Sequence, residues 1–476
     1  MDMLTAHRSF DQFELSVPVI IIGGGGCGLA AALAARDGGT DVLVIERDQK
    51  LSGTTAMSTG LVPAAGTPEQ TAQGITDSPA QFTADIMAKT KGKTDAAIAL
   101  QLAEESAETV SWLRDRHGVG LALITDFLYP GHSAMRMYGM PNRSGAELMA
   151  ALESAAIAAG VDILCDARAE TLYHVGDRIT GVGIVRPDGT REAYGCEALI
   201  LACCGFAGNP DMVRAYLPEL EHATFHGHPS NKGEAMAWGA ELGLQLADMH
   251  AYQGHGGLAV GYGIPILWPL IMEGGFQVNR KGNRFADESS GYSEHAVKVL
   301  AQPEHVAWCI FDQQRYDLMM KFDDFQQAVS AGAVHSASTL EGLAALCGVD
   351  AAGLALTNAA VDKAKCGRAV DAFSRDFANK APLAAPFKAA KVTGALFHTQ
   401  GGIVVDSDAR AIAENGNPMP NLYAGGGAAR GISGPGSDGY MAGNGLLTAT
   451  TLGKLAGRHA AFAIAAMPRS ESGLTQ

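Results

Sequence analysis

The stretch Pro18-Val-Ile-Ile-Ile-Gly-Gly-Gly-Gly-Cys-Gly28 decides the fold of this chain. Its β-branched run from Val19 to Ile22 predicts a buried parallel strand. The glycines that follow fit the spacing G-x-G-x-x-G at Gly23, Gly25 and Gly28. Such glycines allow a tight turn, close backbone contact with a pyrophosphate and close helix–strand packing. Residues 29–35, rich in Ala and Leu, then predict a helix whose N-terminus offers N–H groups to the phosphates.

The stretch Asp41-Val-Leu-Val-Ile-Glu46 predicts the next strand, and Glu46 stands 18 residues after Gly28. An acidic side chain at this place binds the ribose hydroxyl groups of a dinucleotide. Strand, helix, strand and terminal acid together predict a Rossmann-type unit, for which a plain glycine-rich turn is the alternative. The loop Leu51-Ser-Gly-Thr-Thr-Ala-Met-Ser-Thr-Gly60 follows. Its small residues suit contact with a ring system or a phosphate, and a bare turn is the alternative.

Composition limits the classes of function. The chain has 476 residues, enough for two or three domains. Its formal charge of −15 argues against nucleic acid or an anionic membrane as a partner. Residues 250–272 are uncharged but broken by glycines and prolines, and residues 1–16 lack the pattern of a signal peptide. We therefore expect a cytoplasmic protein without a membrane span, and eight cysteines without C-x-x-C spacing predict no metal site.

Further along the chain, the pattern predicts helices over 80–117 and 145–160 and a hairpin of 179–186 with 191–194. A buried strand from Ala198 ends in a glycine turn. Residues 250–390 lose the strand–helix–strand rhythm, whereas strand signals return at 394–405 before a last helix at 448–466. We therefore expect an α/β fold in which a nucleotide-binding domain, residues 1–249 and 394–476, is interrupted by an α+β capping domain, residues 250–393.

Six motifs occur in order along the chain. They are the opening glycine motif with Glu46, the loop from Ser52 to Gly60, Ala202-Cys-Cys-Gly-Phe-Ala-Gly-Asn209, Val278-Asn-Arg-Lys-Gly-Asn-Arg-Phe285, Phe397-His-Thr-Gln-Gly-Gly402 and Leu422-Tyr-Ala-Gly-Gly-Gly427. This order resembles the FAD-dependent fumarate reductase/succinate dehydrogenase flavoprotein superfamily, including the 3-ketosteroid dehydrogenases. The resemblance covers nearly the whole chain.

The resemblance implies FAD rather than NAD, with the substrate between the FAD-binding domain and the cap. Members with covalent FAD carry a histidine in the loop after the acidic strand end. Residues 51–60 contain none, so we expect FAD to bind non-covalently. The stretch Gly443-Asn-Gly-Leu-Leu447 is expected to place a helix N-terminus near the flavin pyrimidine, where its dipole favours the reduced anion. The expected FAD-binding residues are Gly23, Gly25, Cys27, Gly28, Glu46, Arg47, Gly53, Thr54, Thr55, Ser58, Thr59, Gly60, Ala167, Ala202, Gly205, Gly426, Gly427, Asn444, Gly445, Leu446 and Leu447.

The chain departs from fumarate reductases where these hold a dicarboxylate. His255 and His398 resemble the two histidines of the family, but Tyr292 stands where the cap arginine is expected. Leu267 and Trp268 replace a Thr-Glu pair, and residues 433–444 contain no clamp arginine. Burying unpaired carboxylates costs several kcal/mol each, of the order given for buried ions, so fumarate and succinate are disfavoured. Leu267, Trp268 and Gly443 are expected to line an apolar substrate pocket.

Tyrosine in place of arginine resembles the ketosteroid dehydrogenases, in which tyrosines bracket the ketone. Tyr440 matches the phenol that polarises the carbonyl together with a backbone N–H, and Tyr292 matches the proton acid or base by its place in the cap. A phenol of pKa ~10 needs a tuned environment to act as a base. Both tyrosines could instead merely line the pocket. Further candidates are Tyr129, Tyr138, Tyr252 and Tyr262.

These residues predict an FAD-dependent oxidoreductase that dehydrogenates or reduces the carbon–carbon bond α,β to a carbonyl in an apolar, cyclic ketone. Hydride would pass to or from flavin N5, with Tyr440, Tyr292, His398 and His255 as the catalytic residues. One alternative is a reductase of an unsaturated monocarboxylate held by His398 and Arg430. Another is a flavin-binding redox sensor without turnover. The electron partner and the oligomeric state stay open.

Overall fold

The computed structural model describes residues 4–467, and its largest element is a nine-stranded sheet. The strands run in the order β1-β8-β9-β10-β2-β3-β7, with β20 also paired to β10 and β19 to β20. β2, β3, β7, β10 and β20 form the parallel part. The strands are β1 (Leu4–His7), β2 (Leu15–Ile22), β3 (Val42–Ile45), β7 (Asp162–Leu164), β8 (Arg168–Val175), β9 (Arg178–Val185), β10 (Arg191–Leu201), β19 (Arg410–Ile412) and β20 (Pro418–Ala424).

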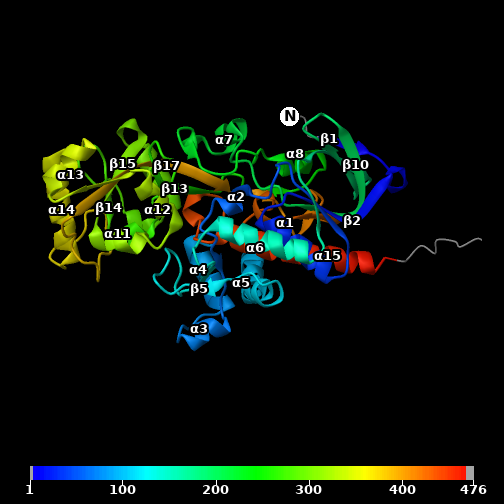
Figure 1. Cartoon of the computed structure of the whole chain (residues 1–476), viewed down its shortest axis with the longest axis horizontal. Coiled ribbons are helices and arrows are strands. Elements are labelled where there is room, and N and C mark those ends of the chain that lie inside the picture. The colour runs from blue at the N-terminus through cyan, green and yellow to red at the C-terminus, as the bar shows by residue number, and fades with distance from the viewer. Residues whose placement is uncertain (1–3, 468–476) are drawn as a thin grey trace, which may run out of the picture.

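The two ends of the sequence meet in one helix pair on this sheet. Helix α1 (Gly26–Asp37) packs against α15 (Asn444–Ala465), and Figure 1 shows these blue and red helices together. A Cβ at Gly453 would lie 2.4 Å from the Cys27 carbonyl oxygen, and one at Gly457 2.0 Å from that of Ala31. Only glycine permits this approach, so the fit of α1 to α15 depends on two residues in the last helix.

The helices and strands predicted for this domain are present, although some of their bounds differ. β2 and β3 flank α1 as expected, and Glu46 follows directly after β3. β9 and β10 form the predicted antiparallel hairpin. The helical stretch 80–117 is divided into α4 (Pro79–Lys89) and α5 (Ala96–Ser111), separated by a turn. The other elements here are α2 (Gly53–Ala56), β4 (Val62–Pro63), α3 (Pro68–Ala72), β5 (Ala122–Leu123), β6 (Met137–Gly139), α6 (Gly145–Ala158), α7 (Pro210–Tyr216), α8 (Glu234–Glu241), β12 (Leu246–Ala247) and β18 (Gly402–Ile403).

A second lobe, green to yellow at the left of Figure 1, is built on a six-stranded sheet centred on the long strand β17. Its alternating buried residues pack into two hydrophobic clusters of its own, separate from the main core. The strands are β11 (Thr224–Phe225), β13 (Tyr252–Ala259), β14 (Phe276–Val278), β15 (Val306–Asp312), β16 (Val334–Ala337) and β17 (Phe387–Thr399). The helices are α9 (Pro269–Met272), α10 (Tyr292–Leu300), α11 (Gln313–Met319), α12 (Asp323–Ser330), α13 (Leu340–Cys347) and α14 (Ala351–Lys365).

The division into a nucleotide-binding domain of 1–249 and 394–476 and a cap of 250–393 remains a proposal. β17 crosses its second boundary, because the strand continues to Thr399, and β11 lies before the first boundary. Residues 1–3 and 468–476 of the proposed domain lie outside the described part of the chain. Within residues 4–467, no helix is long and apolar enough to span a membrane.

Candidate active site

A large cavity extends from the parallel part of the nine-stranded sheet to the cap sheet. It contains about 1850 Å³ of space free of protein atoms, part of it open to solvent. Residues from both lobes line it, with Gly23 and Glu46 at one end and Leu267 and Trp268 at the other.

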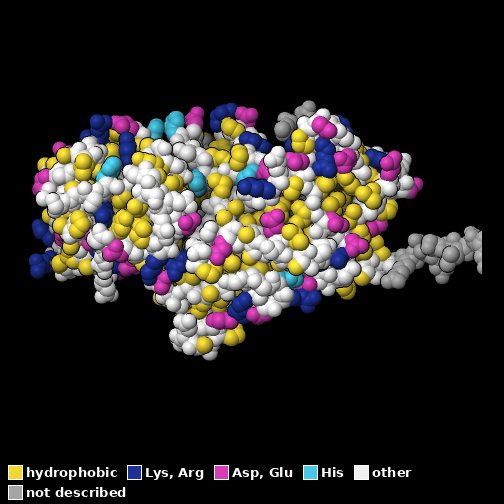
Figure 2. Space-filling view, in the orientation of Figure 1, with side chains coloured by type: hydrophobic (Ala, Val, Ile, Leu, Met, Phe, Trp, Pro, Cys, Tyr) yellow, Lys and Arg dark blue, Asp and Glu magenta, His cyan; other side chains and the backbone are white. Residues whose placement is uncertain are grey.

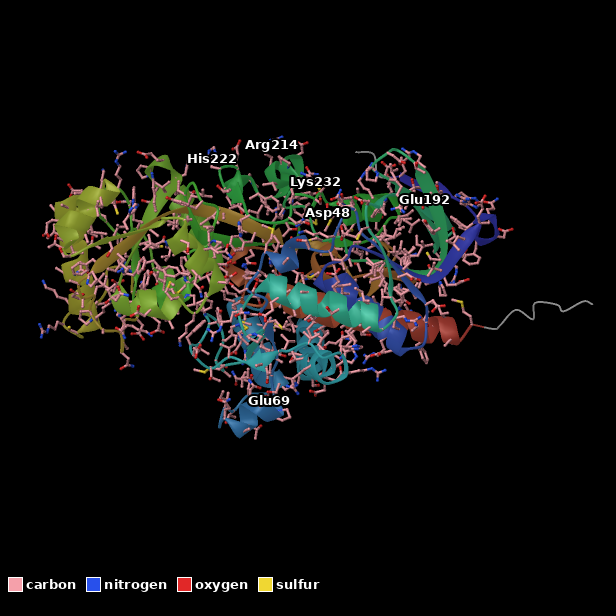
Figure 3. All side chains as sticks on the ribbon, viewed as in Figure 1. Asp48, Glu69, Glu192, Arg214, His222 and Lys232 are labelled. Atoms are coloured by element: carbon pink, nitrogen blue, oxygen red, sulfur yellow. The ribbon has the colours of Figure 1, made fainter. Side chains whose placement is uncertain are left out.

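The first end of the cavity is shaped by the turn between β2 and α1. Gly23 has φ +107°, and a Cβ there would lie 2.5 Å from the Ala202 carbonyl oxygen, so this position requires glycine. The carboxylate of Glu46 accepts the backbone N–H of Gly24 at 2.9 Å and that of Asp48 at 3.1 Å. Asp48, toward the upper edge of Figure 3, also pairs with His228 at 3.2 Å. Glu46 thus fixes the turn while lining the cavity.

The loop after β3 forms one wall. Thr55 Oγ1 accepts the N–H of Gly26 at 3.2 Å, which ties α2 to the start of α1. Thr54 Oγ1 accepts from Asn231 Nδ2 at 2.7 Å, which ties the same loop to the segment before α8. Arg47 lines the cavity but is paired with Glu234 at 2.7 Å. The small residues therefore hold the wall through hydroxyl contacts rather than forming a bare turn.

Most of the expected cofactor residues line the cavity, and five do not: Gly28, Gly60, Gly205, Asn444 and Leu447. Two of these glycines are needed for packing instead. A Cβ at Gly28 would lie 1.9 Å from the Gly23 carbonyl oxygen, and one at Gly205 2.0 Å from Thr399 Oγ1. Leu447 and Asn444 are fully buried. Lining by these five residues is therefore corrected: they support the wall from behind.

The four expected catalytic residues lie together at the cap end. The Tyr292 and Tyr440 rings have centroids 6.0 Å apart, and Tyr440 lies 5.6 Å from His398. His255 lies 5.3 Å from Tyr292 and stacks on Phe397 at 5.1 Å. Tyr292 opens α10 in the cap, whereas Tyr440 precedes α15 in the other lobe. Residues 148 positions apart in the sequence thus form one cluster.

Burial makes this cluster a set of neutral side chains. The Tyr292 hydroxyl and the Gly445 backbone both interact with the Tyr440 hydroxyl. Burial raises the pKa of both phenols well above the ordinary value. Burial also lowers the pKa of His398 to about 4 and that of His255 to about 3. Near neutral pH all four side chains are therefore uncharged.

Tyr292 does not have the environment that a phenolate base needs. Burial is the largest cause of its raised pKa, followed by the nearby Tyr440, Tyr129 and Glu294. Each of these opposes loss of the proton. The structure therefore keeps Tyr292 protonated, which is not the state that a base requires.

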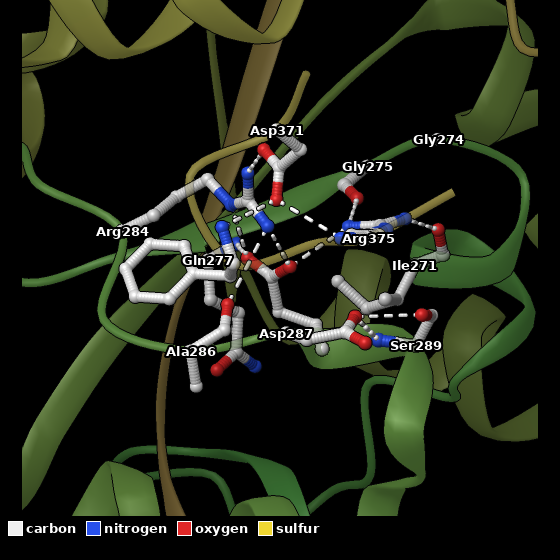
Figure 4. Close-up of polar contacts among 12 residues, drawn as sticks. Ile271, Gly274, Gly275, Gln277, Arg284, Ala286, Asp287, Ser289, Asp371 and Arg375 are labelled. Carbon is white, nitrogen blue, oxygen red and sulfur yellow. Dashed lines mark hydrogen bonds and ion pairs between the residues drawn. The ribbon is translucent and has the colours of Figure 1, made fainter. Parts of the chain in front are cut away.

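The segment that carries Tyr292 rests on a buried charge network, drawn in Figure 4. Arg284 and Arg375 both donate to the Glu288 carboxylate, with N···O distances of 2.8–2.9 Å. The Glu288 backbone oxygen accepts the indole N–H of Trp268 at 3.0 Å. Because all three charged side chains are almost fully buried, removing Glu288 would leave Arg375 without its carboxylate partner. The network therefore holds Trp268 and the start of α10 in fixed positions.

No arginine or lysine from the described residues lines the cap end of the cavity. The predicted apolar residues Leu267 and Trp268 do line it, as does Gly443. Arg430, the carboxylate ligand of the alternative function, is bound to Asp248 at 2.6 Å and Asp95 at 3.4 Å, and it lies off the cavity wall. This arrangement does not favour that alternative, because two aspartates already pair with the guanidinium.

Comparisons with known proteins agree with this geometry. The family model described as FAD binding domain matches residues 18–446. The chain belongs to this family. An NADH:fumarate oxidoreductase of Klebsiella pneumoniae (strain 342) is 29% identical over 458 residues, or 95% of this chain and 48% of that protein. The chain thus spans about half the length of that relative.

Solved structures show the same fold. An open conformation of a flavocytochrome c3 fumarate reductase matches with TM-score 0.78 and 25% identity, over 95% of this chain and 79% of that one. A 3-ketosteroid-Δ4-(5α)-dehydrogenase from Rhodococcus jostii RHA1, solved with 4-androstene-3,17-dione, matches with TM-score 0.74 and 24% identity. That match covers 96% of this chain and 99% of the dehydrogenase. The ketosteroid dehydrogenase therefore shares the fold of this chain.

Three features of the cavity fit the FAD that is expected of this family. Helices α1 and α15 both begin at the cavity, and neither has a side-chain cap at its N-terminus. Uncapped helix N-termini leave N–H groups and positive dipole ends for an anion. A Cβ at Gly25 would meet nothing closer than Thr55 Oγ1 at 3.9 Å, so this turn is open to a ligand. Glu46 lines the wall beside α1, where it would bind the ribose.

Several lining residues were missed from the sequence: His226, His228, Asn231, Gln253, Asp324, Phe397, Gln400 and Ala442. Asp324 is the one acidic side chain that the described part of the cap contributes to the wall. No motif marks it, because it lies on an ordinary amphipathic helix. Gln400 belongs to the motif Phe397–Gly402, two residues after His398, so the sequence could have predicted that it lies near that histidine. Of the further tyrosines, Tyr129 lines the cavity, whereas Tyr138, Tyr252 and Tyr262 do not.

Proposed function

We propose that this protein is an FAD-dependent ene-reductase that reduces the carbon–carbon double bond next to the carbonyl of an apolar, cyclic ketone. The observation that carries the proposal is the pair of neighbouring neutral phenols, Tyr292 and Tyr440, with ring centroids 6.0 Å apart in a cavity end whose described wall has no lysine or arginine. A carbonyl oxygen needs donors rather than charges, and a flat apolar ring suits the wall of Leu267, Trp268 and His255.

Each residue has a distinct part in this reaction. Tyr440, which interacts with Tyr292 and the Gly445 backbone, donates its O–H to the substrate carbonyl. Negative charge that develops on that oxygen is stabilised by the donor already in place. Tyr292 supplies a proton to the α-carbon and is reprotonated from solvent, to which part of the cavity is open. When bound, FAD supplies the hydride for the β-carbon.

The protonated resting state of Tyr292 supports the direction of reduction. Dehydrogenation would need a phenolate to remove a proton, and burial opposes that anion. Reduction uses the neutral phenol, which is the form this environment favours. The relatives reported above include both fumarate reductases and a ketosteroid dehydrogenase, so homology alone does not choose the direction.

Anaerobic titration of the reduced holoprotein tests the proposal. The flavin is photoreduced, and cyclic enones of increasing ring size are added while the flavin absorbance is followed. We expect enones to restore the oxidised spectrum in equimolar amounts, with the saturated ketone as product. The matched saturated ketones should leave the reduced spectrum unchanged. Reoxidation by unsaturated monocarboxylates alone would contradict the proposal, as would a flavin that responds to none of these compounds.

A further inference from the structure

A row of four polar side chains leads from the start of α15 to the cavity wall. Asn444 Nδ2 donates to Ser433 Oγ at 3.3 Å, and Ser433 Oγ donates to Gln400 Oε1 at 2.8 Å. Gln400 Nε2 then lies 3.0 Å from His398 Nδ1. Asn444, Ser433 and Gln400 are 0%, 2% and 4% exposed, so water does not compete for these bonds. The row therefore joins the N-terminus of α15 to the Nδ1 atom of His398.

The order of donors along this row determines the tautomer of His398. A serine hydroxyl has one hydrogen to give, and here its oxygen also receives the Asn444 amide. That hydrogen goes to Gln400 Oε1, which turns the amide NH₂ of Gln400 toward His398. A ring nitrogen that receives an N–H is unprotonated, so a neutral His398 carries its proton on Nε2. The Thr399 carbonyl, 3.2 Å from Nδ1, cannot be its acceptor in this arrangement.

His398 Nε2 lies on the reactive side of the cavity. A Cβ placed on Gly445 would lie 2.9 Å from Nε2 and 3.9 Å from the Tyr440 hydroxyl oxygen. Both groups therefore border the same small space at the start of α15. His398 also lines the cavity, and the burial that lowers its pKa keeps the ring neutral.

We propose that Gln400, oriented by Ser433 and Asn444, is a positioning residue that fixes His398 as a neutral Nε2–H donor beside Tyr440. This inference rests on the proposed function, because it assigns a second donor to the same substrate oxygen. Tyr440 O–H and His398 Nε2–H are then two hydrogen-bond donors at one place, with no acceptor beside them. Such a pair binds a carbonyl oxygen and rejects a substrate group that presents its own N–H. Gln400 thus determines which reacting group the site accepts.

The tautomer can be measured without any substrate. Holoprotein labelled with ¹⁵N-histidine is recorded by long-range ¹H–¹⁵N correlation, and the His398 signals are identified by their loss in His398→Asn. We expect Nδ1 to have the shift of an unprotonated ring nitrogen and Nε2 that of a protonated one. Protonation on Nδ1 would overturn the inference, because it would mean that the row runs in the reverse order.

Variants test whether Gln400 is the cause. In Gln400→Glu, a carboxylate replaces the donating amide and accepts a proton from Nδ1, so we expect Nδ1 to become protonated. Ser433→Ala introduces no charge but frees the Gln400 amide to turn, so we expect a mixture of tautomers. Gln245→Leu is the matched control, because Gln245 donates to the Ala413 carbonyl at 3.1 Å away from the cavity. An unchanged tautomer in both Gln400→Glu and Ser433→Ala would overturn the role of Gln400.

Turnover gives the second readout. Gln400→Glu should lower kcat for an enone by about 10²–10³, the usual effect of losing one donor to a developing oxyanion. KM should stay within a few-fold, and FAD content should match that of Gln245→Leu. A kcat within a few-fold of the parent would overturn the role of the His398 donor. If the parent reduces no enone, the proposed function fails, whereas the ¹⁵N measurement still decides the tautomer.

Discussion

The hydroxyl of Tyr440 lies near Tyr292, His398 and Gly445. Removing this hydroxyl tests its catalytic role without changing the packing of the ring. Tyr440→Phe keeps the buried ring between His398 and Tyr292. We expect enone reduction to fall by about 10²–10³ in kcat, because one donor to the developing oxyanion is lost. FAD content and thermal unfolding should not change. Steady-state kinetics on both proteins check this, and turnover within a few-fold of the parent would assign the polarising role to His398.

Asp324 predicts a pH dependence of stability. Its carboxylate has no hydrogen-bond partner among the described residues, and burial raises its pKa from 3.8 to about 6. Because the folded-state pKa lies above the unfolded value, the folded protein holds this proton more tightly. Stability should therefore fall as pH rises from about 4 to about 6, by at most about 3 kcal/mol at 1.36 kcal/mol per unit.

The substitution Asp324→Asn removes the cost of ionising this buried carboxylate. We expect the variant to unfold at a higher temperature than the parent at pH 8, with little difference at pH 4. Calorimetric scans at the two pH values measure the effect. Asp323, next in the sequence and not on the cavity wall, supplies the control Asp323→Asn. Equal gains from both variants would show a general charge effect on α12 rather than the cost of one unpaired carboxylate in the cavity.

At the scale of elements, the turn between β2 and α1 depends on Glu46. Its carboxylate holds the Gly24 and Asp48 N–H groups and lines the cavity where the ribose is expected. Glu46→Ala should weaken FAD binding by roughly 1.5–3 kcal/mol, the range for hydrogen bonds to a charged group. Titration of the apoprotein with FAD, followed by flavin fluorescence, measures the loss. An affinity equal to that of the parent would mean that Glu46 only shapes the turn.

The elements also mark what a sequence can predict. The β2–α1–β3 unit was predictable because glycine spacing, strand composition and terminal acid all depend on neighbours in the chain. The tyrosine pair was reached only through resemblance, since nothing local brings Tyr292 near Tyr440. Gly28 and Gly205 were assigned to the cofactor, whereas close contacts with Gly23 and Thr399 also require glycine there. The pairing of Arg430 was not predictable, because Asp248 and Asp95 reach it only through the tertiary fold.

At the scale of the whole molecule, we expect FAD between segments from both ends of the chain. Residues 53–55 and 57–59 line the cavity, and the loop 51–60 contains no histidine that could form the family's covalent link. We therefore expect acid precipitation of the holoprotein to release the yellow colour into the supernatant. Absorbance of the two fractions measures this. Colour retained in the pellet would point to attachment elsewhere, with His226 and His228 as the nearest candidates on the wall.

The charges of the whole molecule bear on the last prediction, which concerns fumarate. On the face shown in Figure 2, acidic and basic side chains are interspersed among hydrophobic ones, and the chain carries a net charge of −15. No surplus of positive charge draws a dianion toward the cap end, where the described wall offers no arginine or lysine. The one charged group that the cap contributes there is Asp324, which repels a carboxylate once it is ionised.

Desolvating the two carboxylates of fumarate costs several kcal/mol each, and neutral phenols and imidazoles return only part of that energy. We therefore expect the holoenzyme, supplied with electrons by a reduced viologen dye, to reduce a cyclic enone at least 10²-fold faster than fumarate. That factor corresponds to about 2.8 kcal/mol at 1.4 kcal/mol per decade, less than the cost of one unpaired carboxylate. Rapid fumarate reduction would mean that an arginine enters the site. Arg430 would be the first to substitute, since separation from Asp248 and Asp95 would free its charge.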